Sequence, residues 1–580
     1  MKKAVLVLAL LLMLGAAALP AAAVPTADLT ALARVYPADT AIFAAIRTDE
    51  AYIETLDGII ARINQVLPRS QRIDSLSGSL APVVSMMRAW LGDTAALGIN
   101  AALLLDEDDD NDFLAATLAV ELTDSALAVD FMRGFLSSQV DFEDSYTVEE
   151  SGGVTVFRPK TPRPRLDGVL PFTFTEDYMI VGNPEPVMNR MARLNSVPAF
   201  NETMGALPLG DYNIALYLDT QALFDAQLTA LSELGGIGEM DEALEQFAQA
   251  GRGLSGLGIG FTILDERSLI IDIVSRGDPG AIAGALGLEA SASAEAQPID
   301  LTFARFIPAG TPIVTHVTNL AGAYDTLLDA VRAGALLGGA EDITAEALTE
   351  IESGIAGIEF AVRGLTGLDL KEDILSWMTG DLAIWLGLTP QAAEATSLFR
   401  ALAAGLPVDF GILVDARPNP DGAAALVDGL KNALDFAARQ LPADSTTSIT
   451  VTDETIGGNP AVSASIVDPS LPFPIELVTG ASADVFVIGT RAAAEAALSP
   501  RAGLDSDPAF QEALRYALED TVQLQYLAGA PLAPLFNLLQ GGSSSSPQLG
   551  EIISLISSSS ISSTAADNTA YIRLVLTLAA

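Results

Sequence analysis

The sequence predicts an α+β protein made of two homologous tandem halves, each with a mainly antiparallel sheet and helices packed on one side. Three observations support this fold class: sequence blocks that recur in the same order, hairpins turned by glycine pairs, and strands with one apolar face. Hairpins with segregated helices favour an α+β fold over a doubly wound parallel sheet.

The recurring blocks divide the chain into two halves. Ala-Arg-Val-Tyr-Pro-Ala at 33–38 recurs as Ala-Arg-Phe-Ile-Pro-Ala at 304–309, and a Gly-Asp turn follows a tryptophan at both Trp90 and Trp377. Further blocks recur in the same order, 177–182 as 484–489 and 198–202 as 508–512. We therefore predict a leader at 1–23, a first half at 24–295 and a second half at 296–580, joined by a linker at Ala290 to Pro298.

The leader has the pattern of a secretory signal peptide. Lys2 and Lys3 precede an apolar run to Ala18, and Ala21-Ala22-Ala23 supplies an A-x-A exit site. We expect cleavage after Ala23 and a mature protein that is secreted or lies in the periplasm or cell envelope. The alternative is an uncleaved leader that tethers the protein to a membrane, although the run is shorter than a typical span of ~20 residues.

The elements of the first half follow from its local patterns. Thr123-Asp124 is an N-cap signal, and Leu127, Phe131 and Phe135 at intervals of four residues predict the buried stripe of the helix that follows. The other elements expected are strands at 41–46, 94–105, 113–122 and 268–275, a helix at 50–66, and a hairpin turned by Gly152-Gly153.

The second half repeats this order. Asn419-Pro420 predicts a helix start, with Leu426, Leu430 and Leu434 on one stripe. In the closing strand, Ile572, Leu574 and Leu576 alternate with more polar residues, which predicts a sheet covered on one face. The other elements expected are a strand at 313–317, a helix at 321–337 and a hairpin at Gly457-Gly458, while Ser543 to Ser546 and Ser557 to Ser563 predict flexible loops.

These blocks also carry a family resemblance. The Ala-Arg-Phe-Ile-Pro-Ala-x-Thr-Pro-Ile opening, the helix after it and the Trp-(x)-Gly-Asp-x-Ala turn resemble the bacterial exported protein family known as domain of unknown function 3352 (DUF3352). The resemblance runs over most of both halves and implies a signal-bearing envelope protein. It brings no catalytic residues with it.

The composition excludes several kinds of chemistry. The 580 residues include no cysteine, which removes thiol nucleophiles, disulfides and cysteine-ligated metals. A formal net charge of −44 argues against nucleic-acid binding through a basic face. Hydrophobic residues make up 50% of the chain, which argues against a disordered polyanion.

His316 is the one candidate imidazole base. It lies in a predicted strand on the face opposite Thr315 and Val317, and the matching residue of the first half is Ala45. A site shared by two related halves would use both halves or neither, so we expect a structural histidine.

A second candidate is a phosphate-binding loop, since Gly251 to Gly256 matches G-x-G-x-x-G. Phosphate binding needs a strand before that motif and a helix after it. Here the order is reversed, which predicts a helix end and a linker.

Two charged segments stand out. The acidic run Asp106 to Asp112 lacks the spacing of an EF-hand loop, so we expect a solvated hairpin tip, with weak Ca²⁺ binding as the alternative. The basic island Arg158 to Arg165 carries four cations among three prolines. We expect it to relieve repulsion within the acidic chain, with docking of an anionic partner as the alternative.

We assign no catalytic, cofactor-binding or metal-ligating residue and expect no cofactor. The function that fits best is a non-catalytic binding or structural module of the cell envelope or extracellular space. The alternatives are a carrier or sensor of lipids or other apolar ligands, suggested by the high apolar content, and a carboxylate-dependent hydrolase with two facing acids. The sequence names no partner, beyond an envelope component or an apolar ligand.

Overall fold

The chain folds as two units, Met1–Ile282 and Ala283–Ala580, which we treat separately. The computed structural model describes residues 26–66, 72, 87–100, 116–160, 170–182, 192–233, 253–265, 267–277, 297–322, 324, 345–395, 398–442, 445–539, 553–566 and 568–579. The predicted signal peptide, the acidic run Asp106 to Asp112, Ser543 to Ser546 and most of the linker lie outside these residues.

Unit 1 contains one antiparallel sheet flanked by helices. The strands are β1 Thr40–Arg47, β2 Leu91–Asn100, β3 Ala116–Leu122, β4 Tyr146–Ser151, β5 Val154–Pro159, β6 Phe172–Phe174, β7 Tyr178–Val181, β8 Ile214–Leu218, β9 Leu254–Ile263 and β10 Ser268–Gly277. The helices are α2 Thr26–Ala31, η1 Leu32–Val35, α3 Glu50–Val66, α6 Ser125–Gln139, α7 Phe142–Ser145, η3 Leu194–Ser196, α9 Pro198–Gly205 and α10 Thr220–Glu233.

The strands of unit 2 are also antiparallel to their neighbours. The strands are β11 Ile313–Thr318, β12 Asp381–Leu388, β13 Val408–Asp415, β14 Ser448–Ile456, β15 Asn459–Val467, β16 Ile475–Ala481, β17 Val485–Gly489, β18 Gln523–Leu527, β19 Ile556–Ala566 and β20 Thr569–Leu578. The helices are η4 Leu301–Phe306, α14 Ala345–Thr366, η5 Leu370–Ile374, η6 Leu375–Trp377, α15 Pro390–Ala393, α16 Leu398–Ala404, α17 Pro420–Gln440, α18 Arg491–Leu498, η7 Leu504–Ser506, α19 Pro508–Leu514 and α20 Gly529–Leu539. The predicted α+β class is confirmed.

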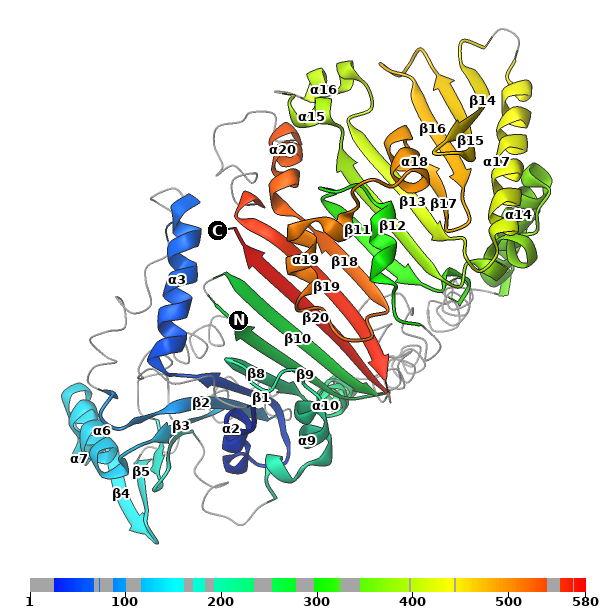
Figure 1. The fold of residues 1–580 in the computed structure, drawn as a ribbon. Coiled ribbons are helices and arrows are strands. Elements are labelled where there is room, and N and C mark those ends of the chain that lie inside the picture. Colours follow the sequence, from blue (N-terminus) through cyan, green and yellow to red (C-terminus); the bar gives the residue numbers. More distant parts are fainter. Residues whose placement is uncertain are drawn as a thin grey trace. The chain divides into compact units, whose positions relative to one another are not determined.

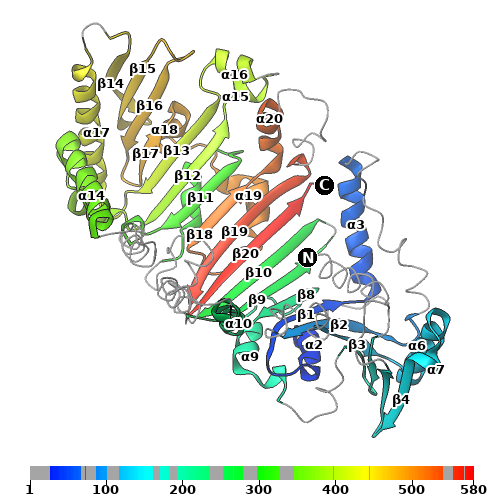
Figure 2. The same ribbon diagram turned by 180° about the vertical axis from the view of Figure 1, so that it is seen from behind.

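The two units have the same strand order. Unit 1 runs β10-β9-β8-β1-β2-β3-β7-β6-β5-β4, with every neighbouring pair antiparallel. Unit 2 runs β20-β19-β18-β11-β12-β13-β17-β16-β15-β14, again antiparallel throughout. Figures 1 and 2 show each sheet from opposite sides. Each strand of unit 1 therefore has a counterpart at the same place in unit 2.

The helix starts and turns form where local chemistry predicts them. The Asp124 side chain caps α6 by accepting a hydrogen bond from the Leu127 amide at 2.9 Å, and Asn419 caps α17 in the same way through Gly422. Gly152, Gly153, Gly457 and Gly458 have positive φ in their hairpins, a backbone region that favours glycine. A Cβ on Gly92 would lie 2.5 Å from Glu121 Cγ, and one on Gly380 would lie 2.6 Å from Asp415 Oδ2, so both Gly-Asp turns need glycine.

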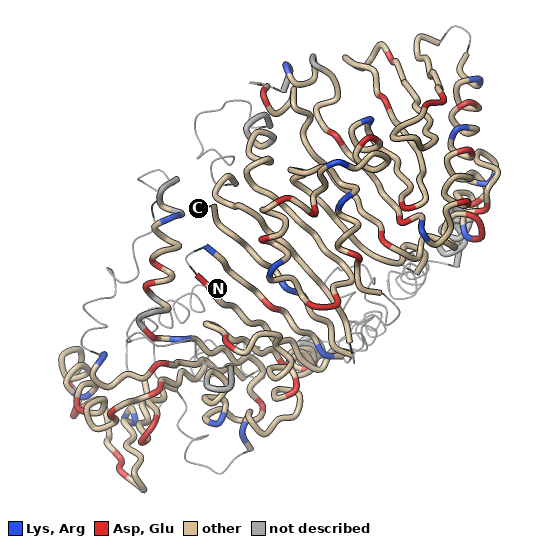
Figure 3. Tube along the Cα trace, viewed as in Figure 1, with Lys and Arg blue, Asp and Glu red and all other residues tan. Residues whose placement is uncertain are grey.

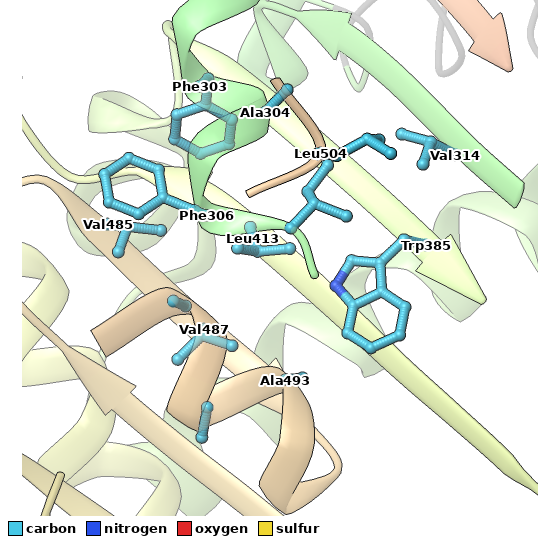
Figure 4. Close-up of a cluster of buried hydrophobic side chains, with 14 of the residues drawn as sticks. Phe303, Ala304, Phe306, Val314, Trp385, Leu413, Val485, Val487, Ala493 and Leu504 are labelled. Atoms are coloured by element: carbon cyan, nitrogen blue, oxygen red, sulfur yellow. The ribbon is translucent and has the colours of Figure 1, made fainter. Parts of the chain in front are cut away.

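The core of unit 2 shows why helices lie against both faces of its sheet. On one face, Phe303 and Phe306 of η4 pack with Val314, Trp385 and Leu413 of successive strands (Figure 4). On the other face, Ala423, Leu426 and Val427 of α17 pack with Val462, Ala481 and Phe486. The expected covering of one side only is therefore wrong in unit 2, because the second face of these strands is also apolar and needs burial.

Two further expectations are corrected. Ser557 to Ser563, predicted as a loop, lie within β19, where Ser558, Ser560 and Ser562 alternate on the buried face. The stripe of α6 that faces the core is Ala128, Met132 and Leu136, one residue along from the predicted stripe, while Leu127 and Phe135 are 42% and 49% exposed.

Candidate functional site

His316 lies on β11 with its side chain 1% exposed. Its Nε2 atom is 2.8 Å from Asp381 Oδ1 at the start of β12, and its ring centroid is 5.8 Å from that of Phe303. The alternation of β11 buries Val314, His316 and Thr318 together, so the predicted face is confirmed.

Asp381 links the histidine to a group of charges at the ends of β11, β12 and β13. Its Oδ1 also accepts a hydrogen bond from the Asp300 backbone amide at 2.9 Å, and its Oδ2 lies 3.6 Å from Arg417 Nη2. Arg417 in turn donates to both carboxylate oxygens of Asp415, at 2.8 and 2.9 Å, and to Asp300 Oδ2 at 2.9 Å. One guanidinium thus joins three carboxylates.

These contacts shift the pKa values of two members of the cluster, Arg417 and Asp300. The hydrogen bonds to Asp415 and Asp300 raise the pKa of Arg417, against the opposing effect of burial. Burial opposes ionisation of Asp300, but hydrogen bonds from Thr302 and Arg417 outweigh it and lower the pKa of that carboxyl. A histidine base for acyl transfer needs a nucleophile and an approach for substrate. A ring that is 1% exposed offers no such approach, and the contacts of the cluster join residues at the ends of β11, β12 and β13.

The same corner of unit 1 carries different charges. Arg47 at the end of β1 forms a buried ion pair with Asp49. Nearby, Glu121 Oε2 accepts hydrogen bonds from Thr94 Oγ1 at 2.8 Å and from the Asp93 amide at 3.3 Å. Burial, together with the Asp49 and Glu121 carboxylates, raises the pKa of Asp93, and Arg47 opposes that shift. A carboxyl with a raised pKa beside other carboxylates is the feature that the carboxylate-dependent hydrolase alternative predicts.

The remaining sequence candidates lie as follows. Gly256 belongs to β9, where a Cβ would meet Thr203 Oγ1 at 2.7 Å, so this end of the G-x-G-x-x-G segment packs against α9. In the described part of the basic island, Arg158 Nε lies 3.3 Å from Glu149 and the Lys160 ammonium donates to the Glu143 carbonyl. Both cations are thus bound within their own unit, while Thr161 to Arg165 lie outside the described residues.

The sequence analysis missed a row of buried side chains that differs between the two units. In unit 1, neighbouring strands place Ala45, Ala215, Gly260 and Asp272 side by side. In unit 2 the row is His316, Leu524, Ser562 and Arg573. The first residue of the row is an alanine in unit 1 and a histidine in unit 2, and the last is an aspartate in unit 1 and an arginine in unit 2.

The partners of this row change with it. In unit 1, a Cβ on Gly260 would lie 2.3 Å from the Tyr212 ring, whose hydroxyl donates to Asp272 and accepts from the Leu209 amide at 2.9 Å. In unit 2, the hydroxyl of Ser562 accepts from the Leu518 amide at 3.0 Å, and Arg573 donates to the Tyr516 carbonyl. In unit 1 the hydroxyl of Tyr212 accepts the hydrogen bond from the Leu209 amide, and in unit 2 the hydroxyl of Ser562 accepts the hydrogen bond from the Leu518 amide.

Sequence reasoning also missed the opposite face of the same strands, which we call the aliphatic face of unit 1. Its side chains share one side of β1, β8, β9 and β10, and eleven of the twelve are apolar. They are Ile42, Ala44, Ile46, Ile214, Leu216, Leu218, Leu257, Ile259, Phe261, Ile271, Ile273 and the single polar residue Ser275. All of the apolar ones are half-buried, so the face keeps contact with solvent. The alternation of Leu257, Ile259 and Phe261 with glycine along β9 is a signal that could have revealed part of it.

The equivalent face of unit 2 is mixed. Of its twelve residues, five are polar: Thr315, Gln523, Gln525, Ser559 and Ser563. The other seven are Ile313, Val317, Leu527, Ile561, Ile572, Leu574 and Leu576.

Comparison with known proteins gives no assignment. No protein-family model and no curated protein matches the chain. Crystal form III of TP0453 is similar over 44% of this chain and 81% of that chain, at 10% identity and a TM-score of 0.21. Crystal form I of TP0453 is similar over 42% of this chain and 77% of that chain, at 8% identity and a TM-score of 0.21. We draw no functional argument from this distant likeness.

The described part of the chain lacks two kinds of feature. It contains no group of three or more histidine, aspartate and glutamate side chains placed to hold a metal ion. None of its helices combines the length and the apolar character needed to cross a membrane.

Proposed function

We propose that the protein is a non-catalytic binding module that works outside the cytoplasm. The observation that carries the proposal is the pairing of charges around His316, where Asp381, Arg417, Asp415 and Asp300 satisfy one another. Figure 3 shows acidic and basic residues distributed over both units. In this proposal the buried charged groups at these strand ends link the strands, and the protein acts by binding partners at its surface.

We also propose that the two units are copies of one ancestral repeat. The identical strand order supports this, as do the equivalent Gly-Asp turns against Glu121 and Asp415. Further support comes from the Leu209 and Leu518 amides, which donate to different hydroxyls at equivalent places. A duplicated module needs no second active site, and its copies are free to diverge in their surfaces.

Export and membership of the exported DUF3352 family complete the proposal. Both rest on sequence. Export rests on the lysine-led apolar run with its Ala21-Ala22-Ala23 exit site, and family membership rests on the repeated Pro-Ala blocks and on the Gly-Asp turns after Trp90 and Trp377. The net charge of −44 suits a soluble surface that avoids anionic polymers.

The test of export is to express the full chain with its own N-terminus in a bacterium, fractionate the cells and measure the intact mass. We expect a chain that has lost residues 1–23, in the extracytoplasmic fraction. A full-length chain in the membrane fraction would indicate a tethered protein, and a full-length chain in the cytoplasm would overturn the proposal. An Ala21→Asp, Ala23→Asp variant serves as a matched control, since it removes the small residues that the exit site needs.

A further inference from the structure

We propose that α6 of unit 1 binds an amphipathic helix of a partner protein, one that has an apolar stripe flanked by basic residues. The inference rests on the proposed binding function and names the chemistry of the partner. It starts from Leu127, Phe131 and Phe135, which lie along one side of α6 and which we call the outer stripe. Because α6 already buries a different stripe in the core of its unit, the outer stripe gives the helix a second apolar side.

The equivalent helix of unit 2 is α17, and the two helices align through their caps. α17 follows β13 as α6 follows β3, and the side chains of Asn419 and Asp124 each accept a hydrogen bond from the amide three residues further on. An alignment on these caps pairs Ala423 with Ala128, and both are 0% exposed. The alignment therefore superimposes the core sides of the two helices.

In unit 2 the aligned stripe is covered by another helix. Leu426 and Leu430 take the places of Phe131 and Phe135 in the alignment. Both leucines belong to a cluster against which Val362 of α14 also packs. α14 runs beside α17 in Figures 1 and 2. This side of the helix thus binds a second helix in unit 2.

Both helices have a glycine on that side. A Cβ on Gly429 of α17 would lie 3.1 Å from Leu368 Cδ1 and 3.1 Å from the Thr366 carbonyl oxygen, so the end of α14 approaches closely here. The aligned residue of α6 is Gly134, and a Cβ there would meet no described atom within 4 Å. Glycine weakens a helix interior relative to alanine. In the described part of unit 1 no packing contact explains Gly134, whereas a closely bound helix would.

The outer stripe of α6 is open to solvent. Leu127 and Phe135 are 42% and 49% exposed. The Phe131 ring stacks on that of Phe135, with centroids 6.3 Å apart, and its other neighbour is the buried Trp90 ring at 5.4 Å. These side chains form one continuous apolar strip that leads from the core to the surface, and a bound helix would remove it from water.

The charges near the outer stripe favour a basic partner. The segment 124–145, which contains α6 and α7, has the acids Asp124, Asp130, Asp141, Glu143 and Asp144 and the single cation Arg133. With a net charge of −44, a second copy of this chain would be repelled, as would an anionic lipid surface. Lysine or arginine beside the stripe of the bound helix would instead be attracted.

The test is a titration of the purified full chain with a fluorescein-labelled synthetic helix of about 18 residues, with leucines along one stripe and lysines elsewhere. Fluorescence anisotropy at physiological salt should show saturable binding of one peptide per chain. Leu127→Ser, Phe135→Ser should weaken binding at least about tenfold. The matched control is Phe360→Ser, which changes a side chain that is 79% exposed in unit 2 and should bind like the parent.

Gly134→Gln separates binding of a helix from a role in folding. Glutamine favours a helix more than glycine does, and no described atom obstructs its Cβ, so the melting temperature should rise. The same side chain would hold a partner helix away, so peptide binding should weaken about tenfold. This variant also decides the matter if the double serine variant does not fold. A higher melting temperature with unchanged binding would overturn the proposal.

A single thiol tests whether the outer stripe is open. The chain has no cysteine, and Ser138 lies three residues after Phe135 on the same side of α6, so Ser138→Cys supplies one reporter. We expect fast reaction with a maleimide, and protection when the peptide is bound. Slow reaction without peptide would mean that another part of the chain covers the stripe, and would overturn the proposal.

The remaining outcomes also decide against it. Dimerisation of the parent that Leu127→Ser, Phe135→Ser abolishes would make a second copy the occupant. Equal binding of a peptide with the same composition in scrambled order would reduce the interaction to net charge. None of these results alters signal cleavage or location, so failure of the helix site and failure of the proposed function remain distinguishable.

Discussion

The two units share a strand order yet fill it differently. In the row that crosses β1, β8, β9 and β10, unit 1 buries Asp272 beside Gly260, while the matching row of unit 2 buries His316 and Arg573 beside Ser562. The comparison teaches that the order of the strands does not depend on one set of buried polar groups. What each unit does require is that its own polar groups find partners.

The largest loss of stability is expected when the serine that unit 2 has at Ser562 is placed at Gly260, the matching position of unit 1. Gly260→Ser would set a Cβ 2.3 Å from the Tyr212 ring, on a central strand with little freedom to move. We expect a loss of about 3 kcal/mol in the free energy of unfolding, measured by urea titration. The matched change in unit 2, Ser562→Gly, should cost only about 1 kcal/mol by removing the acceptor of the Leu518 amide. Equal losses of unfolding free energy in the two variants would contradict the expectation that the two units fill this row differently.

A smaller effect is expected at His316. His316→Ala gives unit 2 the residue that unit 1 has at Ala45, and removes the side-chain partner of Asp381 Oδ1 while the Asp300 amide and Arg417 remain. Urea unfolding should show a loss of about 1–2 kcal/mol. Thr315→Ala, next to it on the half-buried side of β11, is the control and should change stability much less. A variant as stable as the parent would mean that the histidine is not structural.

The smallest effect is expected at Asp93, and its sign depends on pH. The pKa of this carboxyl is raised in the folded protein, so ionisation above the ordinary aspartate range disfavours the folded state. Asp93→Asn should therefore raise the melting temperature at pH 7, and the gain should shrink as the pH falls below that range. Asp130→Asn, on the exposed side of α6, is the control. A gain that persists unchanged at low pH would contradict this cause.

The Asp93→Asn variant also tests the alternative that the protein is a carboxylate-dependent hydrolase. Asp93 lies among Asp49 and Glu121, and a hydrolase that used this group as an acid would lose its activity in Asp93→Asn. A panel of glycoside substrates assayed with the parent chain provides the measurement. Hydrolysis by the parent that the variant lacks would displace the non-catalytic proposal.

Much of the fold follows from local sequence signals. The caps at Asp124 and Asn419 and the glycine hairpins depend on neighbouring residues only, and each lies where it is expected. The serines of β19 were misassigned because composition alone does not register that they pack on a neighbouring strand. The core stripe of α6 was misplaced by one residue, because the position of a helix over its sheet is decided by tertiary packing.

The functional candidates were harder to predict. The burial of His316 followed from alternation along β11, but its link to Arg417 depends on strands that meet only in the folded sheet. The aliphatic face likewise combines β1 with β8, β9 and β10, which are more than 160 residues further along the chain. Only the strand pairing brings those residues into one surface.

The exchange between Asp272 and Arg573 has a consequence for folding. A chain with two sheets of the same strand order risks misassembly, in which a closing strand pairs with the neighbour meant for the other closing strand. If β20 took the place of β10, Arg573 would replace the acceptor of the Tyr212 hydroxyl and leave that hydroxyl facing a cation. If β10 took the place of β20, a buried carboxylate would lie beside Ser562 instead of a guanidinium that reaches the Tyr516 carbonyl. Because of the divergence of this one row, interchanged closing strands would bury mismatched polar groups, which favours the native pairing of each strand.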